Sequence, residues 1–180
     1  MTESPVASDE RTANLLGALA LTLCDRAAAA VQADAGLASS DAAALVTLRN
    51  YAEGEPLDLL RRALALSHPG VVRLADRLQA RGLVERHRSD RDRRAVALRL
   101  TAAGRRAADA ALAARADAID AALETLDAGQ RSDLAPMLER MLGAQTTDST
   151  ASLVICRMCD PDVCGHPGRC PVTQAAIAIA

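Results

Sequence analysis

Apolar residues recur along most of the chain at intervals of three and four, the spacing of helices with one buried face. Gly36, the Gly54-Glu55-Pro56 turn and Gly82 interrupt this pattern. The spacing and the interruptions together predict helices over residues 11–35, 41–52, 57–64, 68–81, 102–126 and 127–142.

Polar side chains suited to helix N-caps precede several of these helices. They are Ser39 or Ser40, Ser67, Thr101, and Asp127, which has capping-box spacing to Gln130. Pro69 fits the first turn of the helix that Ser67 caps. Pro136 predicts a kink or a restart in the final helix.

Two short runs, 83–88 and 95–100, alternate apolar and polar residues and predict β-strands. In the second run Val96, Leu98 and Leu100 share one face. The polar stretch between the runs predicts a hairpin with a charged tip. A short helix, a tight turn, a second helix and such a hairpin follow the layout of a winged helix-turn-helix. We therefore expect a mainly α fold with a small β-hairpin wing.

The net charge of -2 averages over two opposite regions. Residues 61–106 hold 13 Arg and 4 acidic residues, a net charge of +9, and the rest of the chain carries -11. Such a local excess favours phosphate binding. All 21 basic residues are Arg, which suits bidentate base reading and groove insertion. Tyr51 is the only aromatic residue, which disfavours recognition by base stacking.

Three stretches within this basic region resemble the MarR family of bacterial regulators. They read Leu64-Ala-Leu-Ser-His-Pro-Gly-Val-Val-Arg-Leu-Ala-Asp-Arg-Leu78, Ala80-Arg-Gly-Leu-Val-Glu-Arg86 and Asp90-Arg-Asp-Arg-Arg-Ala-Val-Ala-Leu-Arg-Leu-Thr-Ala-Ala-Gly104. The resemblance covers about residues 11–144 and implies a homodimer. Dimerisation helices at 11–35 and 105–143 then interlock, and winged domains at 40–104 bind double-stranded DNA. The resemblance also implies a transcription regulator, most often a repressor, with a small-molecule effector.

A recognition helix enters the major groove with its N-terminal residues toward the bases. In this chain those residues are Ser67, His68, Pro69, Gly70 and Arg73. Arg73 is the candidate for a bidentate contact with guanine. Arg77 is expected either at a phosphate or in an ion pair within the domain.

The family resemblance also assigns roles to the tip of the hairpin. Asp92 supports the wing, and Arg94 inserts into the minor groove, where Arg suits a narrow and electronegative site. Arg91 and Arg93 are expected against phosphates. A dimer of this kind reads a pseudo-palindromic operator whose half-sites lie about one turn of DNA apart.

The chain closes with a cluster of four cysteines, Cys156, Cys159, Cys164 and Cys170. Their spacing is Cys-x2-Cys-x4-Cys-x5-Cys, with Gly, Pro and Asp turns between them, so four thiolates can wrap one ion. We expect tetrahedral Zn²⁺, which such ligands bind and which folds the loop around itself. His166 is a substitute ligand. An iron–sulfur cluster and a switchable dithiol are the alternatives.

The remaining segments are expected to be a disordered N-terminus at 1–10, a polar linker at 145–154 and the metal-binding tail at 155–180. The start of the chain lacks the basic region of an export signal, and the apolar stretch 15–23 is too short to span a bilayer. We therefore expect a cytoplasmic protein with no membrane partner. Cys24, among apolar helix residues, is expected to be a small buried side chain.

Two classes of function compete on this sequence. A dimeric DNA-binding regulator accounts for the basic region and the wing arginines, whether the tail is structural or senses metal or redox state. A metal-dependent protein-interaction module accounts for the tail but not for that charge. An enzyme is disfavoured, because the sequence has no Ser-His-Asp ordering, no phosphate-binding loop and no carboxylate pair suited to acid–base catalysis.

Overall fold

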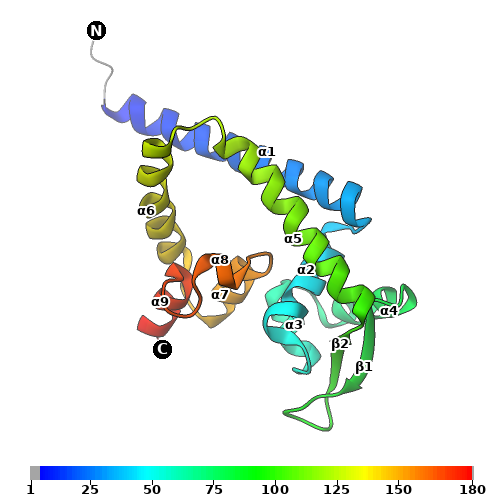
Figure 1. Ribbon diagram of the computed structural model, residues 1–180. Coiled ribbons are helices and arrows are strands. Elements are labelled where there is room, and N and C mark those ends of the chain that lie inside the picture. Colours follow the sequence, from blue (N-terminus) through cyan, green and yellow to red (C-terminus); the bar gives the residue numbers. More distant parts are fainter. Residues whose placement is uncertain (1–4, 180) are drawn as a thin grey trace.

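The computed structural model describes residues 5–179, and its two longest helices lie side by side (Figure 1). They are α1 (Pro5–Ala35) and α5 (Ala102–Leu123), which pack against each other. Both are rich in Ala, the residue with the highest helix propensity. The small side chains also allow the two helices to approach closely.

A winged domain surrounds the N-terminal end of α5. Its helical part contains α2 (Ser39–Thr47), a π-helical turn η1 (Leu48–Ala52), α3 (Leu57–Ala63) and α4 (His68–Ala80). Strands β1 (Val84–Arg88) and β2 (Val96–Leu100) form an antiparallel hairpin, with Val84 opposite Leu100. This order of elements confirms the expected mainly α fold with a hairpin wing.

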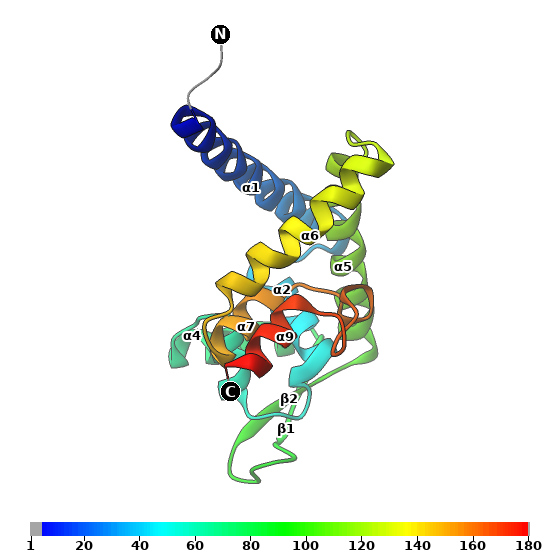
Figure 2. The same cartoon turned by 90° about the vertical axis from the view of Figure 1, so that its left-hand side faces the viewer.

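After α5 the chain turns and runs back along α6 (Ala128–Gln145). It then forms three short helices, α7 (Ser149–Cys156), α8 (Pro161–Cys164) and α9 (Pro171–Ala178). Helix α9 packs against α6, and α7 packs against α3 of the winged domain. Figures 1 and 2 both show that this cysteine-rich end lies beside the winged domain.

The apolar core lies within the winged domain and is centred on α2. Every residue from Asp41 to Thr47 is buried, so this helix is covered on all sides. Helix α4 adds a buried face at the expected spacing, formed by Val71, Leu74, Ala75 and Leu78. Leu98 and Leu100 of the second strand close the core from the wing side.

Three of the expected caps are confirmed. Ser67 accepts a hydrogen bond from the amide of Gly70, and Thr101 accepts one from the amide of Gly104. Asp127 and Gln130 form a complete capping box. Gly82 ends the α4 region with a φ of 68°, a conformation that glycine adopts without strain. These local signals therefore placed the helix ends well.

Other boundaries differ from the expectation. Helix α1 begins at Pro5, so disorder is wrong for residues 5–10, while residues 1–4 lie outside the described part. The N-cap of α2 is Ala38, and neither serine caps it. The helix expected to continue to Ala52 changes to π geometry at Leu48, where tertiary contacts override local propensity.

The hairpin and the expected linker also need correction. Val96 does not join the buried face and is 47% exposed, because it lies near the open tip of the hairpin. Helix α6 continues to Gln145 through Pro136, and α7 begins at Ser149, so most of residues 145–154 are not an extended linker. Asp148 makes this possible, since its carboxylate accepts hydrogen bonds from two amides at the start of α7.

Helix α1 leaves most of its surface exposed, because α5 covers only one side of it. Cys24 is exposed, so its expected burial is wrong for the single chain. The segment Asp9–Ala35, which is longer than the apolar stretch 15–23, is long and apolar enough to cross a membrane by length and composition alone. A single helix of this kind near the N-terminus is a weak indication of a membrane span.

Gly104 provides a test of the packing between α5 and the wing. A Cβ atom at this position would overlap the backbone carbonyl oxygen of Leu83. We expect Gly104→Ala to lower the free energy of unfolding by about 1–3 kcal/mol, the usual cost of overpacking. Gly17→Ala is the control, because nothing lies within 4 Å of its Cβ position. Urea unfolding at fixed protein concentration compares the two, and equal midpoints would contradict this packing.

Candidate functional site

The N-terminal turn of α4 forms an exposed surface at the edge of the winged domain. Ser67, His68 and Pro69 are exposed, and Gly70 is half-exposed. The Ser67 cap fixes the turn, and the buried face of the helix anchors it to the core. The residues expected to face DNA therefore lie together on one accessible surface.

Arg73 and Arg77 are four residues apart on α4, but their surroundings differ. Arg73 is exposed and makes no ion pair with any described residue. The Arg77 Nε donates to Oδ1 of Asp41 at 3.0 Å, and the same carboxylate lies 3.5 Å from Arg81. Asp41 is only 2% exposed, and its hydrogen bond raises the pKa of Arg77. Of the two alternatives for Arg77, the geometry favours the ion pair within the domain.

The tip of the wing is held by a local network of polar groups. Ser89 is buried, and its hydroxyl accepts hydrogen bonds from the amides of Arg91 and Asp92. The Asp92 carboxylate accepts from the amide of Arg94 at 2.9 Å. Asp92 thus shapes the turn from within. This contact agrees with the supporting role that the resemblance implies for Asp92.

The wing arginines divide into paired and unpaired groups. The Arg91 Nε lies 2.9 Å from a carboxylate oxygen of Glu55, although the Arg91 side chain is 77% exposed. Arg93 and Arg94 are exposed, and neither forms an ion pair within the described residues. Their charges are therefore available to an external anion.

Some arginines of the basic region form ion pairs within the chain, and others do not. Within residues 61–106, carboxylates of the described chain pair with Arg61, Arg62, Arg77, Arg81, Arg86, Arg91, Arg99 and Arg105. The arginines of this stretch without such a partner are Arg73, Arg88, Arg93, Arg94 and Arg106. Arg88 and Arg106 are not among the residues that the sequence predicts to contact DNA. Their position in the basic region was the available signal.

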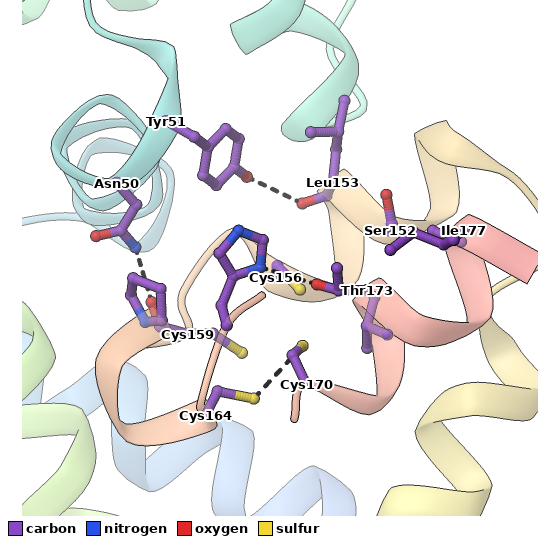
Figure 3. A pocket seen from close by; sticks show the side chains of 14 residues that line it. Asn50, Tyr51, Ser152, Leu153, Cys156, Cys159, Cys164, Cys170, Thr173 and Ile177 are labelled. Atoms are coloured by element: carbon purple, nitrogen blue, oxygen red, sulfur yellow. Dashed lines mark hydrogen bonds between the residues drawn. The ribbon is translucent and has the colours of Figure 1, made fainter. Parts of the chain in front are cut away.

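The four clustered cysteines line one cavity, hereafter the cysteine cavity (Figure 3). Its volume is about 420 Å³. Cys156 ends α7, Cys164 ends α8, Cys170 is the N-cap residue of α9, and Cys159 lies in the turn between α7 and α8. His166 also lines the cavity, and its Nδ1 lies 2.9 Å from the hydroxyl of Thr173. The fold therefore brings together every residue of the expected ligand set.

The thiols lie in two pairs. The sulfurs of Cys164 and Cys170 are 3.6 Å apart, and a hydrogen bond between Cys156 and Cys159 raises the pKa of Cys156 and lowers that of Cys159. Burial raises the pKa of Cys164. For Cys170, burial acts in the opposite direction to hydrogen bonds from Thr173, and the net effect lowers its pKa. Each pair thus joins one readily ionised thiol to one that resists ionisation.

The side chains of the cysteine cavity are not arranged in the geometry of a metal-binding site. Within residues 5–179, no group of three or more His, Cys, Asp or Glu side chains is arranged to hold a metal ion. All five cysteines are free thiols. The expected metal therefore stays a prediction, supported by the convergence of the thiols on one cavity.

Comparison with known proteins found a family model and solved structures that are similar to this chain. Residues 58–95 match the sequence model of the MarR family. No curated protein matches the chain. The structure of YusO from Bacillus subtilis has a TM-score of 0.66 at 19% identity, over 77% of this chain and 97% of YusO. The family model thus matches part of the winged domain, and YusO shares the fold of this chain.

Two further structural neighbours were solved with bound molecules. CouR from Rhodococcus jostii RHA1, bound to p-coumaroyl-CoA, has a TM-score of 0.60 at 26% identity, over 77% of this chain and 95% of CouR. The MarR family protein Rv2887 from Mycobacterium tuberculosis, in complex with DNA, has a TM-score of 0.59 at 23% identity, over 77% of this chain and 98% of Rv2887. MarR family members are transcription regulators rather than enzymes.

The two arginines of α4 allow a test of this division of roles. We expect Arg77→Ala to lower the free energy of unfolding by about 1–3 kcal/mol, because it removes the main partner of a buried carboxylate. Arg73→Ala is the matched control on the same exposed helix side, with an expected change within about 0.5 kcal/mol. Chemical denaturation measures both variants. Equal stabilities would show that Asp41 does not depend on Arg77.

Proposed function

We propose that this protein is a homodimeric transcriptional repressor that reads a pseudo-palindromic operator. Helix α4 enters the major groove with Ser67, His68, Pro69, Gly70 and Arg73, and the wing enters the minor groove with Arg94. The observation that carries this proposal is that Arg73 on α4 and Arg93 and Arg94 at the wing tip are exposed and form no ion pair within the described residues. Arg93 and Arg91 contact phosphates, and the Glu55 contact of Arg91 is exposed enough to exchange for one. A cytoplasmic location is part of the proposal.

Dimerisation is supported by apolar residues that a single chain leaves exposed. On α1 they are Leu15, Leu16, Leu19 and Leu21, and on α6 they are Met137, Leu138, Met141 and Leu142. Burying a side chain of this size contributes about 1.5–3 kcal/mol, so packing these two helices against a partner surface is favourable. A second copy of the chain provides it and places two recognition helices about one turn of DNA apart. A small-molecule effector is also part of the proposal, by analogy with CouR.

We further propose that Cys156, Cys159, Cys164 and Cys170 bind one Zn²⁺ ion. The support is chemical and geometric. With zinc–sulfur bonds of about 2.3 Å, two thiolates on one tetrahedral ion lie roughly 3.8 Å apart. The 3.6 Å between the sulfurs of Cys164 and Cys170 is near that value and far above the roughly 2.05 Å of a disulfide. Cys156 and Cys159 line the same cavity as this pair.

The wing and the recognition helix make separable contributions to DNA binding. We expect Arg94→Ala to weaken binding to every duplex and to reduce the salt dependence by about one unit of log–log slope per protomer. Arg73→Ala should instead relax specificity at one base position per half-site, because it removes a guanine contact. Fluorescence anisotropy over a salt series and selection from a random duplex library measure the two effects. Arg131→Ala, at the start of α6 and away from its exposed apolar residues, controls for the loss of one positive charge. Unchanged binding by Arg94→Ala would remove the wing from the interface.

Metal content tests the cysteine site directly. Protein purified without added chelator should carry about one zinc per chain. Cys164→Ser should lose it, whereas Cys24→Ser should retain it, because Cys24 lies on α1 away from the cavity. Elemental analysis with an anaerobic absorption spectrum makes the measurement. A visible absorption band would show that the site holds an iron–sulfur cluster instead of zinc. Metal-free protein with a new disulfide would show that the cysteines form a redox switch instead.

A further inference from the structure

One short segment of the winged domain is joined to the cysteine tail by three side-chain hydrogen bonds. Thr47 donates to the carbonyl of Arg157 at 3.3 Å, Asn50 to the carbonyl of Cys159 at 2.8 Å, and Tyr51 to the carbonyl of Leu153 at 3.2 Å. Figure 3 shows the last two beside the thiols. All three donors come from the end of α2 and from η1.

The acceptors are backbone carbonyls, which makes these bonds sensitive to the path of the tail. They belong to the residues around Cys156 and to Cys159 itself. A metal bound by these two thiolates fixes the same stretch of backbone. Thr47 is fully buried, and burial raises the pKa of Tyr51 to about 12. Displacement of the tail therefore leaves donors without their partners, which is costly for buried groups.

The next residues along the chain hold the wing. Glu53 accepts a hydrogen bond from the amide of Leu100 at 2.9 Å and forms an ion pair with Arg105 at 2.8 Å. The amide of Gly54 donates to Leu98, and the carbonyl of Gly54 accepts from the amide of Asp90. Gly54 has a φ of 78°, and a Cβ there would overlap the Asp90 carboxylate. The segment thus fits the hairpin closely.

Residues 47–54 are therefore one continuous connection between the cysteine cavity and the wing. Its middle part is the π-helical turn, a geometry that is rare and is found frequently at functional sites. The turn is also tied to α5, because Arg49 lies 2.6 Å from Asp109. A change in the tail has a short covalent route to the base of the hairpin, with hydrogen bonds at both ends.

We infer that occupation of the cysteine cavity by a thiolate-bound metal regulates DNA binding through residues 47–54. This inference rests on the proposed function of the cysteine tail and names its consequence. The bound metal fixes the backbone of residues 153–159. That backbone positions η1 through the three hydrogen bonds, and η1 in turn keeps the wing in its DNA-binding position. Loss of the metal releases the tail and loosens the wing. The loaded protein is the form that binds DNA more tightly.

The experiment compares zinc-loaded and chelator-treated full-length protein in two readouts. Hydrogen exchange reports the protection of the amides in β1 and β2. Fluorescence anisotropy reports binding to a labelled random-sequence duplex of about 30 base pairs, or three turns of DNA. We expect removal of zinc to speed exchange in the wing and to weaken DNA binding on the order of tenfold, within the usual range of allosteric coupling.

Variants of the connecting segment separate coupling from metal binding. Asn50→Ala combined with Tyr51→Phe should keep one zinc per chain but bind DNA with an affinity that no longer responds to zinc. Tyr51→Phe alone, a smaller change, should reduce the response in part. Thr125→Val is the control, because Thr125 also donates to a backbone carbonyl, that of Ala122, but lies far from the segment. It should respond as the wild type does.

The outcomes distinguish this inference from the proposal on which it rests. One zinc per chain with wing exchange and DNA binding unchanged by its removal overturns the inference and leaves the metal site standing. Protein that neither retains nor takes up zinc overturns the metal site and the inference together. A zinc response that survives in the Asn50→Ala/Tyr51→Phe variant shows that the connection through residues 47–54 is wrong.

Discussion

The structure depends on the burial of α2 at the centre of the winged domain. A helix covered on every side has no freedom to shift, and its one buried charge, Asp41, must have a positive partner. Arg77 and Arg81 provide that partner and so fix α4 against α2. The recognition helix is therefore positioned by a buried carboxylate as well as by its apolar face. The same rigid helix continues into η1, which contacts both the tail and the wing.

Ion pairing decides which part of a uniformly basic region is available to DNA. Most arginines between 61 and 106 are already matched to carboxylates, and these pairs shape the domain. Arg73 on α4 and Arg93 and Arg94 at the wing tip have no such match within the described residues. The availability of a guanidinium, rather than its presence, therefore defines the candidate interface. Arg91 is intermediate between the paired and the unpaired arginines, because it forms an ion pair with Glu55 but its side chain is highly exposed.

The return of the chain along α6 gives the cysteines their significance. At the end of an extended tail, four thiols would form an isolated knuckle. In this fold they lie against the π-helical turn, where backbone carbonyls of the tail satisfy polar side chains of the winged domain. Tyr51, the only aromatic residue, is used at this junction and not for base stacking. The composition disfavours recognition by base stacking, and the structure shows that the Tyr51 side chain instead bonds to the tail.

The sequence by itself determined the order of elements, the caps at Ser67, Thr101 and Asp127, and the buried face of α4, because these follow from local spacing and local hydrogen bonds. It also determined that four cysteines form a group, since only a few residues separate them. Tertiary structure decided the π geometry of η1, the pairing of Arg77 with Asp41 and the exposure of Cys24. Each of these depends on a neighbour distant in sequence, or on the lack of one, and no local pattern records that. The placement of the cysteine cavity beside the winged domain is of the same kind, because the turn after α5 and the length of α6 set it together.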